Sequence, residues 1–172
     1  MKPVLLALLA LFSANPGFAA PVVVPDTSVS FEAPAGFTAL TKSEIDARFR
    51  DGAPAHVLGN GDRTVTIAFE LKPFPLADAE LGQTMEGASA AMQGSVPGLK
   101  WIDRKLVELD GQRWIYLEST SATAGKDMHG ILLATPHAGK ALFFEFSATR
   151  EAFAASEAVL RASLKSIRLN SI

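Results

Sequence analysis

Four strand-like segments follow one another without an intervening helix in the second half of the chain, and this run constrains the fold most. The segments are residues 99–109, 112–121, 127–136 and 141–148. Asp110-Gly111 separates the first two, and both residue types tolerate the positive φ of a two-residue hairpin turn. A short turn with Gly139 separates the last two. Consecutive hairpins build antiparallel pairs, so the sheet is predicted to be mostly antiparallel.

Shorter patterns place the remaining elements around this sheet. Residues 29–32 predict a first strand, and Thr41-Lys42-Ser43-Glu44 is a capping box that predicts a short helix through Phe49. Residues 55–58 and 63–71 form a further hairpin, in which a two-residue Asn60-Gly61 turn would place His56 opposite Val65. Apolar spacing predicts helices from Asp78 to about Gln93 and from about Arg150 to Ser166. The predicted order is β-α-β-β-α-β-β-β-β-α, an α+β domain.

Alternation within the strands predicts that each strand has two distinct faces. In the last strand, Leu142, Phe144 and Phe146 point one way, whereas Phe143, Glu145 and Ser147 point the other. In the strand of residues 63–71, an apolar set alternates with a mixed set in the same manner. Side chains therefore project to both sides of the sheet, and the three helices are available to cover them.

The element order resembles that of the PsbP-like and DcrB-like extracytoplasmic proteins. The segment Phe31-Glu32-Ala33-Pro34-Ala35-Gly36-Phe37 and the strand start Gly111-Gln112-Arg113-Trp114 carry the resemblance, which covers about residues 29–169. It implies an α/β/α sandwich around a central, mostly antiparallel sheet, and a role in binding or assembly with no catalytic residues. A helix-grip fold is the alternative, but its two short helices lie together early in the chain, whereas here the helix from Asp78 lies between strands.

The N-terminal residues have the order of a secretory signal peptide. Lys2 is positively charged, residues 4–12 are apolar, and small residues stand at Ala19 and Ala20 after a break at residues 15–17. The apolar run is too short for a typical membrane-spanning helix. We expect a signal peptide over residues 1–20, with cleavage after Ala19 or Ala20. An extended leader over residues 21–28 and a single domain over residues 29–169 would follow, without a membrane span, in the periplasm or outside the cell.

Composition and spacing exclude several kinds of chemistry. The chain has no Cys, a net charge of −2 and 48% hydrophobic residues, so it has ample core material but no disulfide or thiol chemistry. No basic stripe interleaved with aromatics indicates a nucleic-acid partner. His56, His129 and His137 are scattered, and Ser95 lies in a helix-to-strand turn rather than at a nucleophile elbow. We therefore expect no metal, no cofactor and no enzyme activity.

The hairpin around Asp110-Gly111 contains the main candidate binding surface. A two-residue turn pairs Leu109 with Gln112, Lys105 with Tyr116 and Asp103 with Glu118. One face of the hairpin then carries Trp101, Asp103, Lys105, Trp114, Tyr116 and Glu118. Aromatic and charged side chains interleaved in this way are typical of recognition surfaces. The alternative is that a helix packs over the aromatic side chains and that the charges surround it.

Phe74, between Pro73 and Pro75, is a further candidate, either as an exposed docking residue or as a plug against the helix from Asp78. Three functional hypotheses remain open. The first is a non-enzymatic exported binding or assembly module that acts on a protein partner of the cell envelope. The second is a carrier of a small apolar ligand or lipid, with a pocket between the sheet and the helices. The third is a hydrolase of unrecognised type, which would require Asp103, Glu118 and a histidine to converge in a cleft.

Overall fold

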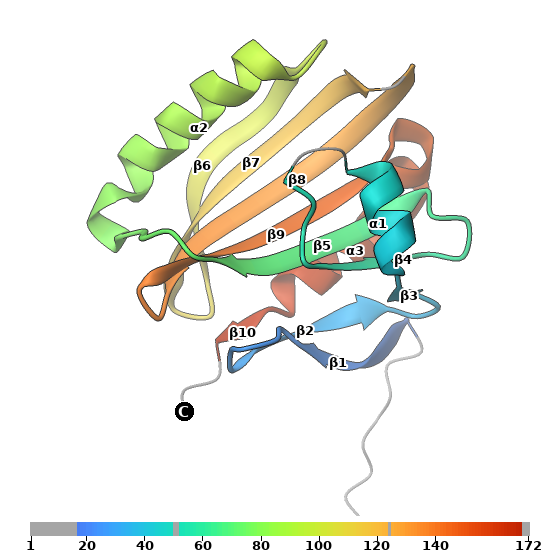
Figure 1. The fold of residues 1–172 in the computed structure, drawn as a ribbon, viewed down its shortest axis with the longest axis horizontal. Coiled ribbons are helices and arrows are strands. Elements are labelled where there is room, and N and C mark those ends of the chain that lie inside the picture. The colour runs from blue at the N-terminus through green and yellow to red at the C-terminus, as the bar shows by residue number, and fades with distance from the viewer. Residues whose placement is uncertain (1–16, 50–51, 124, 170–172) are drawn as a thin grey trace, which may run out of the picture.

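A seven-stranded antiparallel sheet forms the centre of the computed structural model, which describes residues 17–49, 52–123 and 125–169 (Figure 1). From one edge to the other the strands are β3 (Thr38–Ala39), β4 (His56–Gly59), β5 (Val65–Lys72), β9 (Lys140–Thr149), β8 (Lys126–His137), β7 (Gln112–Thr123) and β6 (Lys100–Leu109). A smaller antiparallel sheet contains β1 (Phe18–Val23), β2 (Val29–Pro34) and β10 (Arg168–Leu169). The helices are α1 (Lys42–Arg48), α2 (Leu81–Ser95), which a 3₁₀ turn at Asp78–Glu80 precedes, and α3 (Arg150–Lys165).

The predicted order of the long elements is confirmed. The structure adds the short strands β1, β3 and β10, which the sequence patterns did not predict. Residues 1–16 of the predicted signal peptide, which include Lys2 and the apolar run 4–12, lie outside the described residues. Residues 18–23 form β1, and its Pro21, Val22 and Val23 pair with β2.

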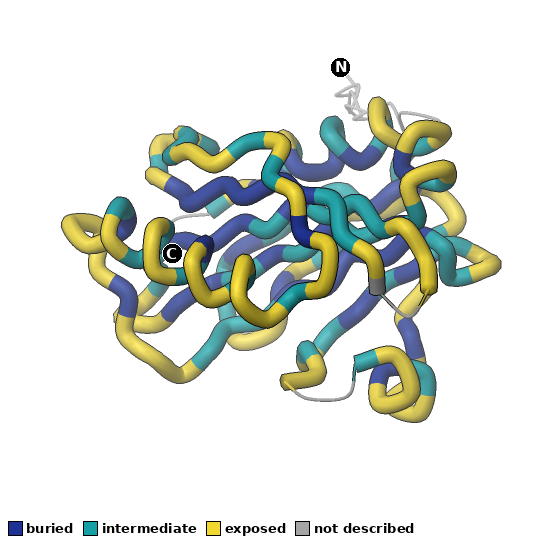
Figure 2. The backbone as a smooth tube through the Cα atoms, turned by 90° about the horizontal axis from the view of Figure 1, so that it is seen from above, coloured by how far each residue is buried: buried dark blue, intermediate teal, exposed yellow. Residues whose placement is uncertain are grey.

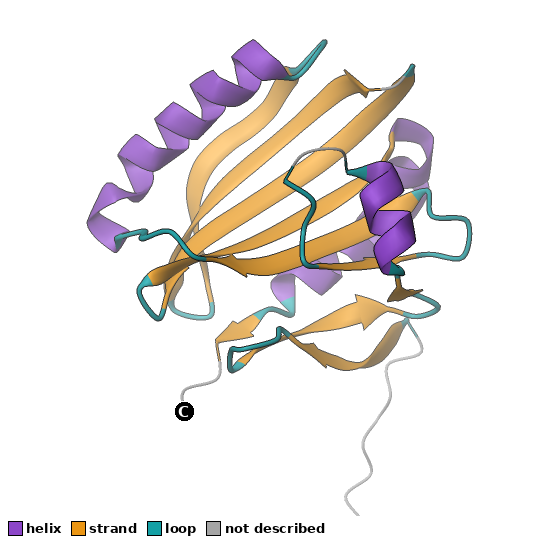
Figure 3. Cartoon of the chain, viewed as in Figure 1, coloured by secondary structure: helices purple, strands orange, loops and turns teal. Residues whose placement is uncertain are grey.

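Strand alternation divides the core between the two faces of the large sheet. On one face, α3 and the small sheet cover a large apolar cluster whose members include Phe31, Ile67, Trp114, Phe144, Phe153 and Leu160. On the other face, α2 packs on Ile115, Leu117 and Ala134, and α1 packs on Val57 and Ala68. The result is the predicted three-layer α/β/α arrangement, with the helices on both faces in Figure 3 and the buried residues concentrated in the strands in Figure 2.

Local capping explains where two of the helices begin. The Thr41–Glu44 capping box is confirmed, since Thr41 Oγ1 accepts from Glu44 N–H and Glu44 accepts from Thr41 N–H. The N-cap of α3 is Thr149, the last residue of β9, whose side chain accepts from Ala152 N–H at 3.2 Å. This cap turns the chain from the sheet directly into α3.

The two predicted hairpin turns have different outcomes. Asp110 and Gly111 both have positive φ, and Leu109 pairs with Gln112 as predicted. At Asn60-Gly61 the predicted register is wrong, because His56 pairs with Phe69 and not with Val65. The loop is longer because Asn60 Oδ1 accepts from Val65 N–H at 3.0 Å and Arg63 adopts a φ of 59°. The register is shifted by four residues, which is an even number. The side chains of β5 therefore still face the sides of the sheet that the sequence predicted.

Candidate functional site

The predicted aromatic face of the β6–β7 hairpin is not an open surface. Trp114, Tyr116 and Glu118 are 0%, 6% and 4% exposed. Arg161 of α3 bonds to Tyr116 and Glu118, and Trp114 lies in the cluster that α3 and the small sheet cover. Trp114 also packs against Phe144 with the ring centroids 6.1 Å apart. The alternative interpretation, in which a helix covers the aromatic side chains, is therefore the one that the structure adopts.

Trp101 does not belong to this face, which corrects the predicted grouping. The register is as predicted from Leu109 back to Asp103, but it shifts between Asp103 and Trp101 at a bulge. The extra residue, Ile102, is 53% exposed, and Trp101 turns to the α2 side of the sheet. There the Trp101 ring lies 5.6 Å from the Arg104 guanidinium.

Glu118 is the centre of a buried polar network between the sheet and α3. Tyr116 donates its hydroxyl proton to Glu118, Arg161 Nη2 donates at 2.7 Å, and His129 Nε2 lies 2.8 Å from Glu118 Oε1. Burial alone would raise the pKa of Glu118, but the hydrogen bonds from these three side chains outweigh it and lower that pKa. Burial and the bond to Glu118 raise the pKa of Tyr116 to about 12.

This network does not have the arrangement that the hydrolase hypothesis requires. Glu118 and a histidine do meet, but Glu118 is neutralised by Arg161 and both His129 and Glu118 are largely buried. The His129 ring stacks on Phe153 with centroids 3.5 Å apart. Asp103 pairs instead with Lys105 at 2.6 Å, and Lys105 also lies 5.3 Å from the Tyr116 ring. The network therefore fastens α3 to the sheet.

The accessible part of the sheet lies on the opposite face, between α1 and α2. A groove of about 730 Å³ is lined there by residues of β7, β8 and β9. Its apolar lining includes Met92, Val96, Leu99, Leu117, Met128 and Leu132, and its hydroxyl-bearing lining is Ser119, Ser121, Ser147, Thr64 and Thr149. A second cleft of about 240 Å³ adjoins it and shares Phe49, Leu132 and Glu145 with it. The two together form one trough along β9.

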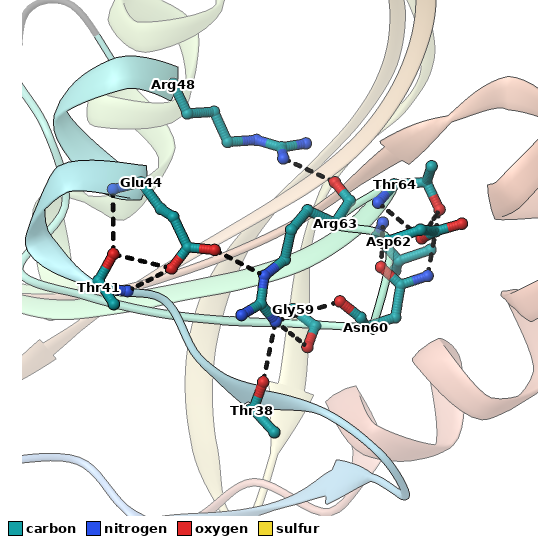
Figure 4. Close-up of polar contacts among 10 residues, drawn as sticks. Thr38, Thr41, Glu44, Arg48, Gly59, Asn60, Asp62, Arg63 and Thr64 are labelled. Atoms are coloured by element: carbon teal, nitrogen blue, oxygen red, sulfur yellow. Dashed lines mark hydrogen bonds and ion pairs between the residues drawn. The ribbon is translucent and has the colours of Figure 1, made fainter.

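One wall of the trough is held by a dense set of hydrogen bonds around Arg63 (Figure 4). Arg63 Nε donates to Glu44 at 3.1 Å, and Arg63 Nη1 donates to Thr38 Oγ1 at 2.9 Å and to the Gly59 carbonyl at 3.1 Å. Arg48 Nη1 donates to the Arg63 carbonyl at 2.7 Å. The end of α1 and the β4–β5 loop are therefore joined into one rim.

Glu145 stands on the trough floor where the two clefts meet. Its pairing partners in the sheet are Leu132 on β8 and Ala68 on β5. Burial raises the pKa of Glu145, and the charge of Arg48 opposes this shift without cancelling it. Within the described part of the chain, no hydrogen bond or ion pair reaches its carboxyl group.

Phe74 lies at the far end of the trough. Its ring meets Phe143, which lines the second cleft, edge-on at 5.6 Å, and the side chain is still 42% exposed. Phe74 thus packs partly as a plug and partly remains accessible. Of the other predicted candidate residues, Trp101 is also near the trough, because it pairs with Ser119, which lines the main groove.

The sequence hypotheses included a pocket between the sheet and the helices, but the residues that line the trough were not among the predicted site residues, although their signal was present. The alternation of β9 places Phe143, Glu145 and Ser147 on one face. A strand face with a carboxylate and small polar residues beside a Phe is unlike a helix-covered core face. In the described residues, no group of three His, Asp or Glu side chains is arranged to hold a metal ion, and no helix is long and apolar enough to cross a membrane.

Comparison with known proteins identifies the fold. The chain is similar to cyanobacterial PsbP (CyanoP) from Synechocystis, with a TM-score of 0.61 and 14% identity over 92% of this chain and 96% of that one. It is also similar to LpqN, described as involved in cell envelope biogenesis of Mycobacterium tuberculosis, with a TM-score of 0.61 and 14% identity over 88% and 90% of the chains.

A further similar structure is PA94 of Pseudomonas aeruginosa, a protein of unknown function, with a TM-score of 0.55 and 11% identity over 90% and 99% of the chains. No protein-family model and no curated protein sequence matches this chain. The structural similarities show that the chain has the PsbP-like α+β fold that the sequence resemblance implied.

Proposed function

We propose that this protein is an exported, non-enzymatic binding module of the cell envelope that holds a segment of a protein partner in the trough between α1 and α2. The observation that carries this proposal is the trough itself, whose main groove of about 730 Å³ lies on a sheet face that helices otherwise cover. The similarity of the fold to LpqN, whose name places it in cell envelope biogenesis, agrees with a location outside the cytoplasm.

The lining of the trough favours a polypeptide over a lipid. Small apolar ligands are held in concave sites that bury most of their surface among mainly apolar side chains. Here the floor carries Ser119, Ser147 and a carboxylate, which would lose hydration without gaining a partner from a hydrocarbon chain. A peptide segment offers both backbone polar groups and apolar side chains, and so it matches this mixture.

Gly130 allows the trough to be filled without disturbing the sheet. It lies on the trough floor, and a Cβ atom added there would meet only the Phe146 carbonyl, at 3.9 Å. Gly130→Leu should therefore fold and block the trough. Gly87→Leu is the matched control, because Gly87 is exposed on α2, outside the trough, with open space around it.

The test is cross-linking in the native envelope, followed by affinity capture of the mature protein and quantitative mass spectrometry. We expect a partner that is captured by the wild type and by Gly87→Leu but lost with Gly130→Leu. Equal capture by all three proteins would overturn the proposal. A lipid that copurifies with the wild type and is lost only with Gly130→Leu would replace it with the carrier hypothesis.

A further inference from the structure

The carboxyl group of Glu145 lies in an environment that is costly for an unpaired charge. Leu132 and Ala68 flank it across the sheet, and Phe49 lines both clefts beside it. Among the described residues, the nearest compensating charge is that of Arg48, which acts without a direct ion pair and donates to the Arg63 carbonyl. A ligand that brings a hydrogen-bond donor to this point would relieve the cost.

The other charged groups around the trough are already engaged or stand at its ends. Arg63 pairs with Glu44, and Asp62 accepts from Thr64 on the rim. At the far end, Lys72 pairs with Glu70 at 2.7 Å. Lys126 lines the opposite end of the main groove. Among the described residues, Glu145 is therefore the charged group in the middle of the trough that accepts no hydrogen bond from the protein.

The surroundings of Glu145 also specify the shape of the donor. Phe49 and Leu132 line both clefts together with Glu145, so a stem that reaches Glu145 would contact apolar side chains while its tip donates a hydrogen bond. Lys and Arg have this construction, with a hydrocarbon stem and a cationic head. An anion at the same place would meet the carboxylate of Glu145 and be repelled.

We propose that Glu145 receives a Lys or Arg side chain from an extended partner segment that lies along β9. This inference rests on the proposed function and names the chemistry that the trough recognises. The floor from Thr149 to Phe143 is about 20 Å long at the rise of a β-strand, which corresponds to roughly six extended residues. Apolar residues beside the cation would contact Phe143 along β9 and Leu132 on the neighbouring strand β8.

The probe that tests this inference is a phage-displayed library of random dodecapeptides, selected on the immobilised mature protein. Four proteins are compared, namely the wild type, Glu145→Gln, Glu108→Gln and the blocked Gly130→Leu. Glu108 is the matched control because it is exposed on β6, away from the trough. Thermal melting of each variant establishes that it is folded before selection.

We expect the wild type and Glu108→Gln to select peptides with Lys or Arg at one position flanked by apolar residues. Glu145→Gln should lose this preference while still selecting apolar peptides. A synthetic peptide of the selected sequence should bind the wild type at least about tenfold more tightly than the same peptide with norleucine at the cationic position, as expected for a charge-assisted hydrogen bond. The same substitution should not change binding to Glu145→Gln.

The outcomes separate this inference from the proposed function. The role of Glu145 would be overturned if the wild type selected peptides without a cationic position, or if Glu145→Gln kept the preference for Lys or Arg. Either result would leave the trough as a binding site. Selection that persists in Gly130→Leu, or that enriches nothing on the wild type, would overturn the trough itself.

Discussion

Glu118 and Glu145 are both carboxylates of the central sheet, but they face opposite sides of it and have opposite environments. Glu118 accepts from Tyr116 and Arg161 beneath α3, and its pKa is lowered. Glu145 faces the trough and accepts from no described donor, and its pKa is raised. Hydrogen-bond donors therefore decide which carboxylate is structural and which is available to a ligand.

Glu118→Gln should destabilise the protein by roughly 2–4 kcal/mol at pH 7. The substitution leaves Arg161 without its anionic partner, although Arg161 is 34% exposed and water offsets part of the loss. Since the folded-state pKa of Glu118 is below its ordinary value of 4.5, its contribution is present above that pH and is lost as the pH falls through the folded value. Thermal melts should show that the melting temperatures of Glu118→Gln and the wild type differ less at pH 3 than at pH 7. An equal difference at both pH values would contradict the pairing.

Glu145→Gln should have the opposite effect and raise the melting temperature at pH 7. The folded-state pKa of Glu145 is above its ordinary value of 4.5, so its charged form destabilises the folded state at neutral pH. The penalty shrinks as the pH falls below the raised pKa and is gone below the ordinary value of 4.5, where the two proteins should melt together. Melting curves between pH 4 and pH 8 measure this. A Gln variant that is less stable than the wild type at pH 7 would show that Glu145 has a stabilising partner.

Trp114→Ala should destabilise the isolated domain by roughly 3–5 kcal/mol, as expected for a fully buried aromatic side chain. Trp101→Ala should cost clearly less, because Trp101 is only partly buried. Urea denaturation of both variants gives the comparison. Fluorescence of Trp101→Ala, in which Trp114 is the remaining tryptophan, should be blue-shifted, and red-shifted emission would mean that α3 does not cover Trp114.

Among the elements, β6 is an edge strand whose sequence discourages further pairing. It is ten residues long, and the exposed side chains on it include Arg104, Lys105 and Glu108. The bulge between Trp101 and Asp103 also interrupts its regular ladder. Charges and bulges are common means of protecting an exposed edge from association with another chain. A binding role by strand addition at β6 is therefore less favourable than binding in the trough.

Helix α2, which forms one wall of the trough, contains three glycines, Gly82, Gly87 and Gly94. Gly87 lies in the helix interior, with nothing within 4 Å of an added Cβ atom. Gly87→Ala should therefore stabilise the protein by about 0.5–1 kcal/mol through backbone entropy. Denaturant unfolding measures this change, and a loss of stability would mean that α2 is distorted at this position.

At the scale of the whole molecule, the two faces of the sheet are covered to different extents. On one face α3 and the small sheet bury a continuous cluster, whereas on the other α1 and α2 stand apart (Figure 1), and residues of both helices line the trough. The covered face therefore provides most of the core, and the other face keeps an accessible groove.

Export is the prediction that concerns the whole chain. Mass spectrometry of the protein from the native envelope should find its N-terminus at Ala20 or Pro21. Such a product would keep Pro21, Val22 and Val23 paired with β2 and Val24 in the core, so removal of the preceding residues should leave the domain folded. Recovery of the intact Met1 form from the cytosol would contradict export.

The sequence by itself determined the order of the long elements, the faces of the strands and most of the β6–β7 register. Each of these depends on local rules, namely the period of two in a strand and the positive φ allowed in Asp-Gly. Two features escaped these rules. The bulge at Ile102 moved Trp101 to the other face, and the Asn60 side chain lengthened the β4–β5 loop.

Only the tertiary structure decided which sheet face is covered and which is open. Alternation defines two faces but contains no information on where a helix docks, since that depends on contacts between residues far apart in the chain. Arg161 on α3 reaches Glu118 and so closes the face that carries the aromatic side chains. Arg63 fixes α1 at the opposite rim from α2, and the floor around Glu145 is left between them.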